Sequence, residues 1–295
     1  MAGAAPVSAV GMGLTAAALW GGSDFAGGLG ARRAPALLVV AAGHLVTFSL
    51  LFVVCAGAGI PLPAQRCVLL GVAAGVEGAL SLAIFYRALA EGAMGVTAAV
   101  TGVLTAAVPV GFALVSRMWT RQGWPRATEW AGLAAGAAAI ALAAWPSEAR
   151  PSQLGTTRRA LGMGAVAGVG FGVQLVLLKL AAEGGVAWAM TTARAGGLAG
   201  VALVLFLRLL RRRGVRLPRS GYWRMGMAAG AMDALGNGAY MLAAGVGRME
   251  VGAMIASLYP VATIGLAAVV LRERPGARQK MGMALAVVAL ALLSW

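Results

Sequence analysis

The chain has 295 residues, of which 60% are hydrophobic and only 11% are charged, and its mean hydropathy is +0.85. An ordinary soluble domain carries about 25% charged residues, so this composition excludes a soluble globular protein and indicates that the lipid bilayer is the solvent. The net charge of +15 comes mainly from residues at the ends of apolar segments, which points to membrane topology and lipid headgroups rather than nucleic-acid binding.

Apolar segments long enough to cross a bilayer follow one another along almost the whole chain. About 20 helical residues span the roughly 30 Å of hydrocarbon, and the segments lack the alternation of barrel strands. The first segment has neither a basic region before it nor a cleavage signal, so we expect a retained helix and not a removed signal peptide. We predict ten transmembrane helices, at 7–30, 36–58, 66–90, 93–117, 126–145, 160–182, 186–210, 222–246, 249–272 and 276–295.

The ten segments form two copies of a five-segment unit, which divides the chain into 1–148 and 149–295. Landmark residues recur about 150 positions apart, and the acids of the third and eighth segments each follow an Ala-Ala-Gly sequence. Because five is odd, the two copies must have opposite orientations in the membrane. This is the inverted-repeat plan of secondary transporters, which places a site near the midplane between the repeats. The corresponding residues are Trp20 and Phe171, His44 and Arg194, and Glu77 and Asp233.

Many of the 44 glycines lie at a spacing that favours close helix packing. The pairs Gly71–Gly75, Gly132–Gly136 and Gly164–Gly168 each place two small residues on one helix face, where another backbone can approach closely. We interpret these pairs as packing contacts and not as part of a site.

Ionisable residues inside the spans are the first candidates for function, because a charge at the bilayer centre costs roughly 2.5–3.5 kcal/mol. Glu77 and Asp233 fall near the middle of their helices, and His44 and Arg194 lie roughly 12 Å deep at 1.5 Å per residue. We expect Arg194 to pair with Asp233, and His44 with Glu77, around a shared aqueous cavity in which the two acids face each other. The alternative is that each pair only clamps neighbouring helices.

A carboxyl group at the midplane can exchange a proton for substrate, so Glu77 and Asp233 are also the predicted residues of proton coupling. Glu77 is the better candidate of the two, because an arginine partner would keep Asp233 ionised.

Aromatic and neutral polar residues on neighbouring spans complete the predicted site. Gly21 and Gly22 can loosen the first helix and expose carbonyl groups, while Asp24 fits the cavity and the interface equally well. Pro260 removes a helical hydrogen bond, which makes the segment around it a candidate hinge, as does Pro109 in the fourth helix. The amides of the set fit interhelical bonds as well as bonds to substrate. The predicted substrate-binding residues are Trp20, Ser23, Asp24, His44, Glu77, Gln174, Arg194, Asp233, Asn237, Tyr240 and Tyr259.

Short motifs occur in a constant order along both halves: Leu19-Trp20-Gly21-Gly22-Ser23-Asp24-Phe25, Phe85-Tyr86-Arg87-Ala88-Leu89, Ser257-Leu258-Tyr259-Pro260 and Val270-Leu271-Arg272-Glu273-Arg274. In their order and spacing they resemble the EamA-like family of the drug/metabolite transporter superfamily. The resemblance implies a ten-helix transporter made of two EamA units, which moves small polar or amphipathic metabolites, often outward. It also implies that both termini lie inside the cell.

Other functional classes fit the sequence less well. His44 is the only histidine, so we predict no catalytic triad, zinc site or other cofactor, and no nucleotide-binding motif is present. A non-transporting scaffold or sensor subunit is the alternative. We therefore predict a multi-pass transporter of the plasma or inner cell membrane that works as a monomer by alternating access and exports small metabolites or amino-acid-like solutes. Most lysines and arginines lie in odd-numbered connections, which favours those loops in the cytoplasm and leaves the orientation open.

Overall fold

In the computed structural model of the protein, the described residues are 5–90, 94–119, 126–143, 154–211, 221–246, 249–270 and 277–293. These ranges contain α-helices and one turn of 3-10 helix, η2, and they contain no strand. The elements are α1 Ala5–Ala31, α2 Ala36–Gly57, α3 Gln65–Ala90, α4 Met94–Trp119, α5 Ala127–Ala143, α6 Leu154–Ala181, η2 Ala182–Gly184, α7 Val186–Leu210, α8 Tyr222–Val246, α9 Met249–Ala256, α10 Tyr259–Val270 and α11 Ala277–Leu293.

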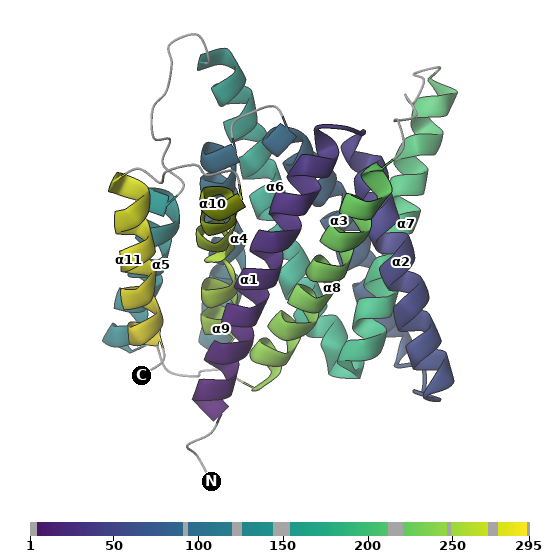
Figure 1. Cartoon of the computed structure of the whole chain (residues 1–295). Helices are drawn as coiled ribbons and strands as arrows, with labels where there is room; N and C mark the ends of the chain where they lie inside the picture. The colour runs from purple at the N-terminus through teal and green to yellow at the C-terminus, as the bar shows by residue number, and fades with distance from the viewer. Residues whose placement is uncertain are drawn as a thin grey trace.

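The long helices lie side by side in one bundle, and α1 begins on the side of the bundle on which α11 ends (Figure 1). By length and composition, the stretches within the described ranges that can cross a membrane are 36–57, 65–90, 162–184 and 186–210. Shorter apolar helices accompany them. The bounds of α2, α7 and α8 agree with the predicted helices to within one residue, because loop residues interrupt the apolar runs at those points.

Helices of one half pack mainly on helices of the other half. α1 packs on α8 as α6 packs on α3, and α2 packs on α8 as α7 packs on α3. α4 lies against α6, while α9 and α10 lie against α1. α5 pairs with α11, and α2 also contacts α7. Exchanging the two halves therefore reproduces the same set of contacts.

Small residues bring these helices into backbone contact. A Cβ atom at Gly75 of α3 would collide with the backbone of Ala193 on α7. A Cβ atom at Gly230 of α8 would collide in the same way with Gly43 on α2. Gly168 of α6 packs on α4, where a Cβ atom would lie 2.7 Å from the carbonyl oxygen of Thr101. The predicted packing role is confirmed for Gly71, Gly75 and Gly168, and the helices are close enough to exclude side chains at these points.

The predicted helix 249–272 is interrupted in the structure. A turn at Ser257 and Leu258 separates α9 from α10, and α10 begins at Tyr259, one residue before Pro260. Proline has no N–H group to bond the carbonyl one turn earlier, so the helical ladder ends before it. Pro109 has no such effect, since it lies inside an α4 that runs from Met94 to Trp119.

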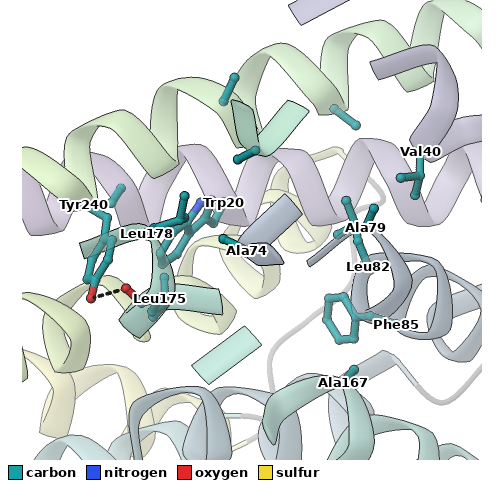
Figure 2. Close-up of a cluster of buried hydrophobic side chains, with 14 of the residues drawn as sticks. Trp20, Val40, Ala74, Ala79, Leu82, Phe85, Ala167, Leu175, Leu178 and Tyr240 are labelled. Carbon is teal, nitrogen blue, oxygen red and sulfur yellow. Dashed lines mark hydrogen bonds between the residues drawn. The ribbon is translucent and has the colours of Figure 1, made fainter. Parts of the chain in front are cut away.

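The largest group of buried apolar side chains lies where α1, α3, α6 and α8 meet (Figure 2). It includes Trp20 of α1, Leu82 of α3, Leu175 of α6 and Tyr240 of α8. Helices from both halves thus share one apolar core, and most of the polar residues described below lie on these same helices.

Candidate functional site

A small cavity lies among α1, α3, α4, α6, α8 and α10. Its volume is about 40 Å³, room for two to four water molecules at roughly 10–15 Å³ each. Typical ligand pockets measure roughly 300–1,000 Å³, so the site is too small for a metabolite in this conformation. Each half of the chain contributes to its wall. The lining residues are Trp20, Asp24, Leu82, Thr105, Phe171, Gln174, Leu175, Asp233, Asn237 and Tyr259.

An ion pair between α7 and α8 adjoins this cavity. Arg194 Nη1 lies 2.5 Å from Asp233 Oδ2, and the two side chains are 3% and 15% exposed. Asn237 Nδ2, one turn further along α8, donates a second hydrogen bond of 3.3 Å to the same oxygen. The predicted pairing of Arg194 with Asp233 is confirmed. Asp233 and Asn237 also line the cavity, whereas Arg194 does not. The guanidinium is therefore joined to the cavity wall through Asp233.

The predicted pairing of His44 with Glu77 is wrong. His44 Nδ1 donates to the carbonyl of Val40, 3.1 Å away and one turn earlier in α2, and its ring lies against Gly197 of α7. Glu77 Oε1 accepts a hydrogen bond of 2.6 Å from Ser81 Oγ on the same helix, and its Oε2 has no partner in the described structure.

The geometry of α3 explains this separation. Glu77 and Ser81 point toward Gly170 of α6, whereas Ala79 shares the environment of the His44 ring beside α7. Residues two positions apart in a helix point to nearly opposite sides, so the carboxylate of Glu77 faces away from His44. Glu77 and Asp233 therefore do not face each other as predicted: they contact different helices, and Glu77 is outside the cavity lining.

Asp24 belongs to the cavity and not to the interface. Its side chain is 7% exposed, and within the described ranges no residue forms a hydrogen bond or ion pair with its carboxylate. The preceding residue, Ser23, points elsewhere, because its Oγ lies 3.1 Å from the hydroxyl of Tyr86 on α3. Asp24 thus combines burial, a position in the wall and an unused pair of acceptor oxygens.

Aromatic rings form one side of the site. The ring of Trp20 meets Tyr259 edge-on at 6.4 Å and Tyr240 at 6.0 Å between centroids. The Tyr240 hydroxyl donates to the carbonyl of Leu175 at 3.3 Å, which directs this tyrosine into the core (Figure 2). The hydroxyl of Tyr259 is buried; Thr105 is near enough to interact with it, but their arrangement lacks hydrogen-bond geometry. Tyr259 therefore offers an unused polar atom beside Asp24.

Sequence reasoning did not find every residue of the wall. Phe171 was recognised as the counterpart of Trp20 but not as a site residue, and the same spacing applied to Asp24 would have indicated Leu175. Thr105 and Leu82 carry no sequence signal that separates them from helix packing. Of the predicted residues, those that line the cavity are Trp20, Asp24, Gln174, Asp233, Asn237 and Tyr259, and those that do not are Ser23, His44, Glu77, Arg194 and Tyr240.

A second, wider hollow of about 630 Å³ lies at the ends of α1, α3 and α7. Arg32, Arg87 and Arg208 stand around an otherwise apolar wall. Arginines at helix ends are typical of the headgroup region of a membrane. Arg212, Arg213, Arg216 and Arg219 continue the basic stretch that begins at Arg208 in the sequence, and they lie outside the described residues. Across the described ranges, no group of three metal-ligating side chains occurs.

Comparison with known proteins gives this architecture a context. Residues 158–295 match the EamA-like transporter family. A protein of known crystal structure is 18% identical to this chain and superimposes with a TM-score of 0.69, over 97% of this chain and 96% of its own. At this identity the likeness concerns the fold alone. No curated protein matches. The family match confirms the resemblance over the second half of the chain, and the apolar helices indicate a multi-pass membrane protein.

Proposed function

We propose that this protein, whose residues 158–295 belong to the EamA-like transporter family, is a secondary transporter that exports a small metabolite by alternating access. The proposed transporter has ten membrane crossings arranged as two inverted five-helix repeats, and α9 and α10 together make one crossing. The exchange symmetry of the helix contacts supports this arrangement, as does the fact that α1 begins on the side of the bundle on which α11 ends (Figure 1).

The observation that carries the proposal is the origin of the cavity wall. α1, α3 and α4 come from the first half, and α6, α8 and α10 are their counterparts in the second half. A site between two inverted repeats is reached from one side of the membrane when the repeats tilt one way and from the other side when they tilt back. The small volume of the cavity fits a conformation in which no substrate is bound.

Two features suit such a movement. Glycine contacts, such as Gly43 on Gly230, leave smooth surfaces on which helices can shift. The break before Pro260 divides one crossing into two short helices, and its second helix carries Tyr259 into the cavity wall. A change of angle at this break would move Tyr259 relative to Trp20.

Proton coupling is the second part of the proposal. Asp233 is paired with Arg194, whereas one oxygen of Glu77 has no partner in the described structure. Glu77 is therefore the proposed proton-carrying group, acting through the α3–α6 contact beside the cavity. The protein would work as a monomer in the cell membrane, because both repeats are present in one chain.

The test is transport itself. Purified protein is screened for thermal stabilisation by small metabolites, and any compound that stabilises it is then loaded into proteoliposomes for exchange against external labelled compound. We expect exchange by wild type, loss of exchange in Asp233→Asn, and faster net movement under an imposed pH gradient. Binding without exchange would favour the scaffold or sensor alternative, and indifference to the pH gradient would remove proton coupling.

A further inference from the structure

The cavity between the halves contains a carboxyl group that no described basic side chain pairs with. Both Asp24 and Asp233 line it, but only Asp233 has a partner, Arg194. No lysine, arginine or histidine is among the lining residues. An ionised carboxylate buried without compensation is costly, so a proton or a bound cation must balance Asp24. The wall therefore favours a positively charged guest.

The remaining wall suits the other parts of an amine. Trp20, Phe171 and Tyr259 provide aromatic faces, which attract cations and pack on apolar groups. An ammonium group has up to three N–H donors and needs as many acceptors. Besides the carboxylate of Asp24, the wall contains further acceptors: Thr105 Oγ1, the unpartnered Tyr259 hydroxyl and the amide oxygens of Gln174 and Asn237.

A substrate carboxylate finds no equivalent site. Arg194 is joined to the wall through its ion pair with Asp233, and it does not itself line the cavity. A free amino acid would place its carboxylate against an acidic and aromatic wall. Like charges in a space of low polarity repel strongly, so the wall disfavours anions and zwitterions.

We infer that the transported solute is an organic ammonium ion with an apolar, preferably aromatic, body and no carboxylate, and that its charged group binds Asp24. This inference rests on the proposed transport function and narrows its substrate class from amino-acid-like solutes to amines. The bound state requires a wider cavity than the present one of about 40 Å³; in it the ammonium group lies beside Asp24 and the body lies along the aromatic rings.

The experiment compares four probes that share one body: 2-phenylethylamine, 2-phenylethanol, phenylacetate and L-phenylalanine. Their binding to the purified full-length protein is measured by calorimetry at neutral pH. We expect the amine to bind at least tenfold more tightly than each of the others. Equal or tighter binding of L-phenylalanine or phenylacetate, or no binding of the amine, overturns the inference from the wild-type protein alone.

The matched variants are Asp24→Asn and Glu183→Gln, each of which removes one negative charge. Glu183 is exposed in η2, outside the cavity, so its replacement should leave amine affinity within twofold. Asp24→Asn should weaken amine binding at least tenfold and leave 2-phenylethanol unaffected. Amine affinity within twofold of wild type in Asp24→Asn overturns the assignment of Asp24.

Failure of the inference and failure of the proposed function give different results. Proteoliposomes that exchange L-phenylalanine or phenylacetate but not the amine leave the transport function in place and refute the substrate class. Protein that binds the amine through Asp24 but exchanges none of the probes supports the binding site and contradicts transport.

Discussion

The ion pair between Arg194 and Asp233 predicts a specific rescue. Arg194 is only 3% exposed, and its Nε already lacks a partner, so Asp233→Asn leaves a buried guanidinium facing a neutral amide. Removal of one partner from a buried pair costs about 3–5 kcal/mol. The new asparagine oxygen can still accept one hydrogen bond, which returns about 1 kcal/mol. We therefore expect Asp233→Asn to lower the free energy of unfolding by about 2–4 kcal/mol.

The second substitution removes the orphaned charge. Arg194→Gln in the Asp233→Asn background places two neutral amides opposite each other, so it should restore about 1–3 kcal/mol of the loss. Arg194→Gln alone leaves a carboxylate that Asn237 still contacts at 3.3 Å and that the cavity partly solvates. Its cost should therefore be smaller than that of Asp233→Asn.

Equilibrium unfolding in mixed detergent micelles measures all three variants, with Glu183→Gln as the control for loss of a surface charge. If the double variant is destabilised by the sum of the two single effects, the residues are not coupled and the clamp does not exist in the membrane-like state. A double variant that is more stable than Asp233→Asn but inactive would separate the clamp from the role of Asp233 in the cavity.

Three further predictions address packing, coupling and the hinge. Gly230→Ala should destabilise the protein by about 1–3 kcal/mol through backbone overlap with α2, whereas Gly245→Ala on the same helix has open space and should cost nothing in the same unfolding assay; equal effects would contradict the close contact. Glu77→Gln should abolish the response of net transport to an imposed pH gradient while exchange persists, and a retained response would assign coupling elsewhere. Pro260→Ala should slow transport severalfold in proteoliposomes by joining α9 to α10, while Pro109→Ala, in an unbroken helix, should not; similar losses in both would argue against a hinge.

The depth of residues could be predicted from the sequence, but their direction could not. A rise of 1.5 Å per residue places Arg194 and Asp233 at levels that long side chains can bridge, and this pair is present. The same arithmetic applies to His44 and Glu77, which face different helices. Membrane helices that are apolar on all sides give no hydrophobic face from which to read rotation. Only the packing of α3 between α6 and α7 fixes the direction of Glu77.

Two other differences have local causes. Pro109 and Pro260 occupy corresponding places in the two halves, and nothing in either residue shows that only the second interrupts its helix. From the sequence, Asp24 fitted the cavity and the interface equally well. Its position along α1 determines its depth in the membrane, but it does not determine which residues surround it. The tight contacts of Gly21 with α10 and Gly22 with α8 decide the matter, since they fix α1 against the second half of the chain.

The two halves supply equivalent positions to the cavity but different chemistry. Trp20 of α1 has its counterpart in Phe171 of α6, and Asp24 has its counterpart in Leu175, and all four line the same wall. The polar site is therefore one-sided: the first half offers the unpartnered carboxylate, and the second half holds its own acid, Asp233, with Arg194. Two free carboxylates in so small a space would repel each other, and two clamped ones would offer a guest no charge. With one of each, the ion pair joins α7 to α8 and the cavity keeps one unpaired carboxyl group, which is what the proposed carrier of a single cation requires.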